Sequence, residues 1–261
     1  MSDSSRVFVF DANAVQTKHG RRRFLANLAM AAGAIALAPM IERGAGIGDV
    51  LRAQASGETE PNLTDNDILN YALTLEYLEA TFYLRADSGG TLPTGATIAA
   101  LDPDGNATPG IVAGLAGMTF PAPSTQSIPT FFRAVRDHEI THVLTLQNAL
   151  GGFALSRSNF KFNFGTAFAS ASNFMNTAMA LEDTGVSAYL GQVANLESLS
   201  ILSTLVTIQA VEAEHAAAVG VALGQPVIAG DVPFDTAKTT TQVLTIANGF
   251  ITQAPTLPFP K

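Results

Sequence analysis

The chain has 261 residues, no cysteine, and a net charge of −8 from 14 basic and 22 acidic residues. Without cysteine it holds no disulfide, no iron–sulfur cluster and no thiolate zinc site. The first 55 residues contain seven of the basic and four of the acidic residues, which leaves residues 56–261 a net charge of −11. A nucleic-acid partner is therefore not expected.

The N-terminal segment has the pattern of an export signal. Residues 21–25 match the twin-arginine pattern R-R-x-F-L, whose signal residues here are Arg21, Arg22, Phe24 and Leu25. The uncharged stretch 24–41 and the candidate cleavage site Ala53-Gln54-Ala55 follow. We expect a leader over 1–55 that directs the folded chain through the twin-arginine export machinery to the periplasm or cell envelope. The alternative is an uncleaved leader that anchors the protein in the membrane, although about 18 residues is short for a span.

Four segments have the apolar spacing and the end signals of long helices. The first opens with Thr64-Asp65-Asn66-Asp67, which is good capping chemistry. The fourth ends at Gly224, with Pro226 just beyond it. The predicted helices cover about 65–85, 127–150, 170–192 and 198–223. Because each carries aliphatic residues at helical spacing, they predict an all-α four-helix bundle in one domain, 56–261.

Three connections complete the predicted fold. A segment of about 40 residues, about 87–126, is rich in Gly, Pro, Thr and Ser and is an inserted loop between the first two helices. Segment 151–165 is long enough to cross the bundle, so the second and third helices run parallel. Residues about 226–261 form a C-terminal cap with a short fifth helix over about 235–250. Within the insertion, Asp102–Asn106 resembles the start of a calcium loop but lacks its later Glu, so an ordinary turn is expected.

Two ExxH motifs, each preceded by an E-x6-Y motif, dominate the chemistry of the chain. In chain order the four motifs are Glu76…Tyr83, Glu139–His142, Glu182…Tyr189 and Glu212–His215. Residues three apart share a helical face, so each ExxH aims one carboxylate and one imidazole at the same point. Residues seven apart differ by only about 20° around the helix, so each tyrosine can hydrogen-bond a metal ligand from one layer away.

The four glutamates of these motifs fall near the middle of their helices, where they can meet at one level of a bundle. A bundle of mostly apolar helices does not bury four carboxylates without compensation. Two divalent cations would balance the four negative charges. We therefore predict a two-metal site with the ligands Glu76, Glu139, His142, Glu182, Glu212 and His215. The alternative is a metal-free relic or a solvated polar face.

Four neighbouring ionisable residues are not predicted to be ligands. Glu79 shares the face of Glu76, but only Glu76 repeats the E-x6-Y spacing. His138, Asp183 and Glu214 lie one or two positions from a predicted ligand, so they are expected to point elsewhere, to the surface or to the layer around the site.

The segments around these motifs resemble the ferritin-like superfamily, and within it a branch of bacterial and plant proteins often labelled desiccation-related. The resemblance covers about 65–223 and rests on the segments NYALTLEYLEATFYL, RDHEITHVLTLQNALGG, MALEDTGVSAYLGQV and VTIQAVEAEHAAAVG. It implies a ferritin-like bundle in which the six residues above bind the metals and Glu139 and Glu212 bridge them. It specifies a fold and a site but not a reaction.

The sequence leaves two functions open. The first is an exported di-metal protein, with two iron or manganese ions, that handles peroxide or oxygen in stress protection; both metals suit the carboxylate–imidazole set. The second is a non-catalytic structural or stress-protective envelope protein that retains the bundle. An iron-storing cage is less favoured, because the long insertion can obstruct such an assembly. Low charge and high alanine content are compatible with a homo-oligomer.

Overall fold

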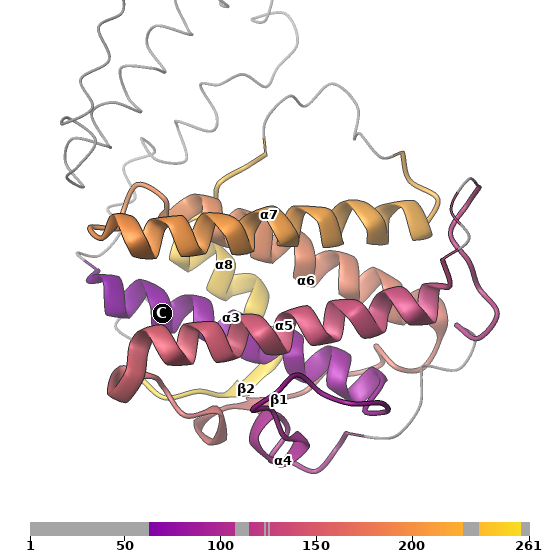
Figure 1. The fold of residues 1–261 in the computed structure, drawn as a ribbon, viewed down its shortest axis with the longest axis horizontal. Helices are drawn as coiled ribbons and strands as arrows, with labels where there is room; N and C mark the ends of the chain where they lie inside the picture. The colour runs from indigo at the N-terminus through magenta and orange to yellow at the C-terminus, as the bar shows by residue number, and fades with distance from the viewer. Residues whose placement is uncertain (1–62, 108–114, 123, 125, 227–234, 257–261) are drawn as a thin grey trace, which may run out of the picture.

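A computed structural model describes residues 63–107, 115–122, 124, 126–226 and 235–256. The expected leader, 1–55, with its signal residues Arg21, Arg22, Phe24 and Leu25, lies outside the described residues, so the export signal stays a prediction. Within the described part, four long helices run side by side (Figure 1). They are α3 (Asp65–Ala86), α5 (Ile128–Leu150), α6 (Ala171–Gln192) and α7 (Leu199–Ala222).

The four helices pack as two pairs. α3 packs mainly against α5 and α6 mainly against α7, while smaller contacts join α3 to α6 and α5 to α7. In Figure 1, α7 and α5 lie one above the other, with α6 and α3 behind them. The predicted all-α four-helix bundle is confirmed, and its helix ends fall within one residue of those expected. No helix in the described part of the chain is both long and apolar enough to cross a membrane.

Side-chain caps explain where the long helices begin. The Thr64 hydroxyl accepts a hydrogen bond from the backbone N–H of Asp67, and the Asp67 carboxylate accepts one from the backbone N–H of Thr64. Ser127, Ser170 and Ser198 each accept a backbone N–H at the start of the other three helices. These bonds satisfy N–H groups that have no partner within the helix.

The insertion between α3 and α5 is anchored to the bundle where the structure describes it. It contains a short helix, α4 (Ile98–Leu101). After α4, Asp102 and Asp104 form ion pairs with Arg85 of α3, at N···O distances of 2.8 and 3.2 Å. The Asp102–Asn106 segment thus uses its carboxylates to anchor the loop, in agreement with the ordinary turn that its sequence predicts.

The C-terminal part and the crossover differ in detail from the expected fold. The fifth helix, α8 (Thr240–Ala247), is shorter than the expected 235–250, because Thr239 caps it, and it packs against α6. Beyond it, β2 (Ile251–Gln253) pairs antiparallel with β1 (Lys161–Phe162) of the crossover. The sequence did not indicate this sheet, since strands this short have no recognisable alternation. The crossover also holds two 3₁₀ turns, η1 (Gly151–Phe153) and η2 (Arg157–Asn159).

Aromatic rings fill the core beside Tyr83. The rings of Phe82 and Phe174 stack with centroids 5.0 Å apart, and Tyr83 stacks on Phe132 at 6.0 Å. Phe132 in turn meets Phe174 edge-on at 4.8 Å. Rings packed in this way hold one another in place, so the Tyr83 hydroxyl is fixed where it faces the middle of the bundle.

Candidate metal centre

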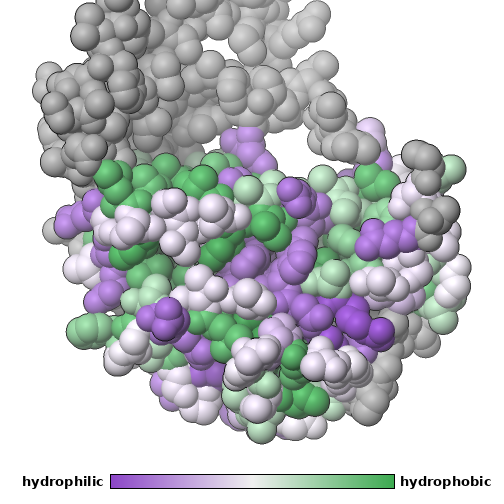
Figure 2. Space-filling model, in the orientation of Figure 1, coloured by the Kyte–Doolittle hydropathy of each residue, from purple (hydrophilic) through white to green (hydrophobic). Residues whose placement is uncertain are grey.

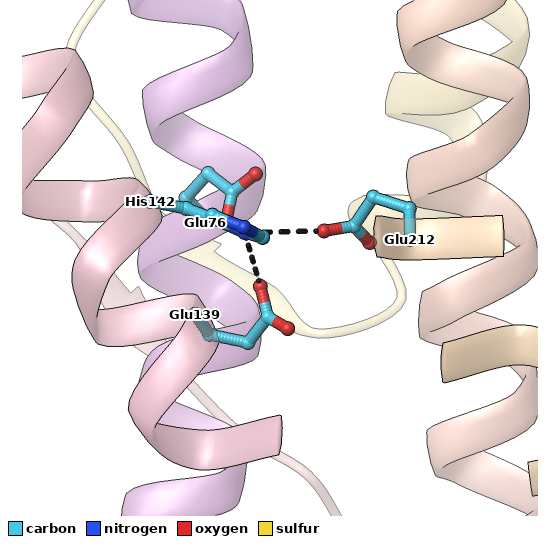
Figure 3. A group of neighbouring side chains, drawn as sticks. All are labelled: Glu76, Glu139, His142 and Glu212. Carbon is cyan, nitrogen blue, oxygen red and sulfur yellow. Dashed lines mark hydrogen bonds and ion pairs between the residues drawn. The ribbon is translucent and has the colours of Figure 1, made fainter. Parts of the chain in front are cut away.

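The six predicted ligands lie together in the middle of the bundle. α3 supplies Glu76, α5 supplies Glu139 and His142, α6 supplies Glu182, and α7 supplies Glu212 and His215. They form two overlapping groups of four, in each of which every residue offers a ligand-type atom within 4.8 Å of the others. One group is Glu76, Glu139, His142 and Glu212 (Figure 3); the other is Glu139, Glu182, Glu212 and His215. Only Glu139 and Glu212 belong to both groups.

Both imidazoles direct Nδ1 at the carboxylates. His142 Nδ1 lies 3.0 Å from a Glu139 oxygen and 3.3 Å from oxygens of Glu76 and Glu212. Figure 3 shows Glu212 reaching His142 from the opposite side of the bundle. His215 Nδ1 lies 2.9 Å from the other Glu139 oxygen and 3.2 Å from Glu182. The i, i+3 spacing of each ExxH therefore delivers both of its side chains to the same place, as its helical geometry requires.

The charges of the centre are strongly coupled. Burial raises the pKa of Glu212 well above its ordinary value, and the charges of Glu139 and Glu76 raise it further. Burial also raises the pKa of Glu76 to about 7, although His142 opposes it. Burial disfavours the charged form of both imidazoles, but the nearby carboxylates outweigh this effect. They raise the pKa of His142, and they raise the pKa of His215 to about 11. Without bound metal, the protonated imidazoles therefore supply part of the positive charge that metal ions would supply.

The donor set fits metal ions. Four buried carboxylate oxygens, Glu76 Oε2, Glu139 Oε1 and both oxygens of Glu212, accept no hydrogen bond. Three of them lie 2.9–3.3 Å from an imidazole nitrogen, but without hydrogen-bond geometry. In the described part of the chain, the two imidazoles are the only ion-pair partners of these glutamates. Buried carboxylates without donors are costly, and carboxylate with imidazole is a set that suits iron and manganese, so the cluster suggests metal binding.

The two tyrosines of the E-x6-Y motifs form hydrogen bonds crosswise. The Tyr83 hydroxyl on α3 donates to Glu182 on α6, and the Tyr189 hydroxyl on α6 donates to Glu76 on α3. Burial, together with the nearby carboxylates, raises the pKa of both hydroxyls well above the ordinary value, so both remain donors. Each tyrosine therefore orients the glutamate of the other motif. The E-x6-Y spacing predicts that each tyrosine hydrogen-bonds a metal ligand, but it does not predict which ligand.

His138 contacts the centre, although its position in the sequence predicts that it points elsewhere. Its Nδ1 lies 2.9 Å from Nε2 of His215, and the two rings stack with centroids 5.2 Å apart. Desolvation and the charge of His215 lower the pKa of His138. A neutral His138 accepts the Nε2 proton of His215 and leaves Nδ1 of His215 directed at the carboxylates. Asp183 and Glu214 are exposed, as expected.

Glu79 is a fifth buried carboxylate at the centre. Only 2% of its surface is exposed, and its Oε2 has no hydrogen-bond partner. Burial raises the pKa of Glu79 well above its ordinary value, and the nearby Glu212 adds to the effect. The sequence places Glu79 on the same helical face as Glu76, and this shared face could have indicated its position at the centre. The E-x6-Y spacing, however, favours Glu76 alone.

A pocket of about 430 Å³ opens between α5 and α7 beside the imidazoles. Its polar lining consists of His138 of α5, His215 and Glu214 of α7, and Ser124 and Gln126 of the insertion. Its apolar lining includes Phe120, Phe131, Val135 and Val221. The side chains of His142 and His215 are 10% and 4% exposed, whereas those of the four glutamates around them are not exposed. Figure 2 shows hydrophilic residues gathered across the middle of this face, between α7 and α5. A small molecule in the pocket therefore approaches the centre from its imidazole side.

Comparison with known families agrees with this architecture. Residues 64–225 match a family model described as a ferritin-like domain. The match includes the four long helices and all six predicted ligands, and it covers more than half of the chain. No curated protein matches the chain.

Proposed function

This chain belongs to the ferritin-like domain family, and from that premise we propose that it binds two iron or manganese ions and uses them to handle peroxide or oxygen. One observation carries the proposal: two groups of four ligand-type residues overlap in Glu139 and Glu212, as a pair of neighbouring metal ions requires. The proposal assigns Glu76 and His142 to one metal, Glu182 and His215 to the other, and the two shared glutamates to both.

The residues around the ligands have defined tasks in this proposal. When bound, two iron or manganese ions would supply the electron exchange that reduction of peroxide or oxygen needs. Tyr83 and Tyr189 hold the glutamates at the two ends of the centre through their hydrogen bonds. His138 keeps the proton of His215 on the nitrogen that faces away from the carboxylates. Hydrogen bonds of this kind fix the orientation of metal ligands.

The pocket between α5 and α7 supports a reactive centre rather than a purely structural one. It leads to His215, and its volume of about 430 Å³ is ample for a peroxide or oxygen molecule. An opening of this kind gives a small molecule a route to His215.

We also propose that the protein acts in the periplasm or cell envelope, in the setting of stress protection that the desiccation-related resemblance suggests. The R-R-x-F-L pattern at 21–25 supports export in the folded state. Folding before export would let iron or manganese bind away from competing copper and zinc. Changing Arg21→Lys together with Arg22→Lys should retain the protein in the cytoplasm, as cell fractionation would show. Unchanged export of that variant would contradict the proposal.

Metal content decides the main proposal. Protein purified from its native compartment should contain two iron or manganese ions per chain by elemental analysis, and the loaded protein should consume peroxide or oxygen. The Glu139→Ala/Glu212→Ala variant removes both shared ligands and should contain neither metal. Glu197→Gln, which changes an exposed glutamate outside the centre, is the matched control.

The same experiment separates the alternatives. A loaded protein that consumes neither peroxide nor oxygen would favour the non-catalytic structural or stress-protective envelope protein. A size-exclusion mass near that of a monomer or dimer would exclude an iron-storing cage. The same measurement would show whether the protein forms a homo-oligomer.

A further inference from the structure

Glu79 is buried beside the six predicted ligands, although it belongs to neither of their two groups. It lies one turn after Glu76 on α3 and faces α6 at Gly185. A Cβ atom built on Gly185 would lie 3.4 Å from Glu79 Oε1 and 2.6 Å from Glu212 Oε2. The two carboxylates therefore occupy the space that the absent side chain of Gly185 leaves open.

The two halves of the centre differ at this one position. Glu79 follows Glu76 by three residues, and Gly185 follows Glu182 by three residues, so the two occupy equivalent places in the repeated E-x6-Y helices. Helix α3 thus has a carboxylate at the position where helix α6 has no side chain. The glycine accommodates the added carboxylate, because any larger residue on α6 would displace Glu212.

No cationic side chain of the described residues pairs with Glu79. No ion pair of the described residues includes it, and both imidazoles of the centre are directed at other carboxylates. A buried acid without a partner destabilises a fold, and an apolar residue of similar size would pack here without that cost. The fold therefore gains no stability from Glu79 in the absence of a cation.

We propose that Glu79 is a fifth carboxylate of the metal centre and suits it to a metal pair that carries more than four positive charges. The inference rests on the proposed two-metal function and deepens it. Two divalent ions balance four carboxylates, and a fifth carboxylate adds a negative charge that a trivalent ion balances. Iron and manganese reach the trivalent state, whereas zinc, magnesium and calcium do not. Glu79 therefore selects for a redox-active pair and stabilises its oxidised form.

The test compares ferrous and oxidised iron in purified protein. Wild type, Glu79→Gln and Glu79→Asp are loaded anaerobically with Fe²⁺, and the midpoint potential of the bound iron is measured by potentiometric titration. Ferricyanide then takes one electron from each iron ion, and the release of iron is followed with a chelator. Circular dichroism and the melting temperature of the metal-free proteins check that each variant folds, and Glu197→Gln is the exposed control.

Glu79→Gln should bind two Fe²⁺ with nearly the affinity of wild type, since four carboxylates suffice for two divalent ions. Its midpoint potential should be more positive, and after oxidation it should retain iron about 10- to 100-fold less tightly, the usual effect of losing a group that supports a metal ligand. Glu79→Asp keeps the charge and should behave more like wild type.

Two outcomes would overturn the inference, and they are distinguishable. If Glu79→Gln binds two iron ions with unchanged potential and unchanged retention after oxidation, the role of Glu79 is wrong while the two-metal centre stands. If folded wild type binds no iron or manganese, the proposed function fails as well.

Discussion

The protein contains two clusters of buried acids, and they are balanced in opposite ways. Beside α3, Asp102 accepts two hydrogen bonds from the guanidinium of Arg85, at 2.8 and 3.0 Å, and Lys161 pairs with the neighbouring Asp104. Arg157 lies 3.9 Å from both aspartates, with its guanidinium over the ring of Phe162. In the metal centre, by contrast, no lysine or arginine of the described chain pairs with the glutamates.

This difference in charge compensation distinguishes the aspartate cluster, which stabilises the fold, from the glutamate cluster, which suggests metal binding. Burial raises the pKa of Asp104, but Lys161 and the nearby arginines outweigh it and lower that pKa below its ordinary value. The pKa of Glu79 and that of Glu212 instead rise well above theirs, because burial and the neighbouring carboxylates both raise them. Where a carboxylate holds the fold together, the chain supplies its partner. Where the described chain supplies no lysine or arginine, the cluster of carboxylates and imidazoles suggests binding of an external cation.

The largest expected effect concerns the structural cluster. Asp102→Ala leaves the buried Arg85 with a weaker partner, so the free energy of unfolding of the metal-free protein should fall by about 3–5 kcal/mol. Urea denaturation followed by circular dichroism measures it. Glu212→Gln is the matched change in the metal centre and should cost less than about 1 kcal/mol, because an amide replaces an acid whose pKa is already raised. If Asp102→Ala and Glu212→Gln lose the same free energy of unfolding, the two clusters do not differ in their contribution to the fold.

The next effect concerns stabilisation by metal. Manganese or ferrous iron at 100 to 1,000 times its dissociation constant should raise the free energy of unfolding by about 3–4 kcal/mol. Thermal denaturation with and without metal measures this gain. Glu139→Ala/Glu212→Ala should show no gain, whereas Asp102→Ala should show the full gain, if the two clusters are independent. A gain that survives in the double variant would place the metal elsewhere.

A smaller effect is expected at the contact between α6 and α7. In Gly185→Ala the new Cβ would lie 2.6 Å from Glu212 Oε2, so this carboxylate must move. The change should cost about 1–3 kcal/mol of stability through overpacking and should weaken metal binding about 10-fold or more. Calorimetric metal titration measures the affinity. Gly152→Ala meets no atom within 4 Å and should change neither quantity.

The smallest effect concerns the crosswise tyrosines. Tyr83→Phe removes the donor to Glu182 and should cost about 1 kcal/mol in the metal-free protein. It should weaken mainly the metal position of Glu182 and His215, whereas Tyr189→Phe should weaken mainly that of Glu76 and His142. A metal titration that resolves two steps measures the difference. Identical effects on both steps would show that the tyrosines do not act on separate halves.

Local signals made much of this protein predictable. Caps such as Thr64 and Ser198 and terminators such as Gly224 place the helix ends within one residue, because capping depends on neighbours in the chain. The ExxH and E-x6-Y spacings identified the six residues that the structure brings together, because the faces of a helix follow from its period. Metal binding by these residues stays a prediction, as do the leader, the desiccation-related branch and the iron or manganese content.

Other features had no local signal. The sheet of β1 and β2 and the short α8 depend on segments far apart in the chain that meet only after folding. The contact of His138 with His215 depends on how α5 is rotated against α7. The ion pair between Asp102 and Arg85 joins the insertion to α3, and it could not be predicted from either segment alone.

By itself, the sequence determined an all-α bundle and six residues with the chemistry of a metal centre, because helical period, capping and residue type are local properties. Only the tertiary structure decided that Glu79 lies buried beside those six residues, where Gly185 leaves room for it. It also decided that Tyr83 and Tyr189 serve opposite glutamates. These features depend on the stagger and rotation of packed helices, which are set by the whole core and not by any one segment.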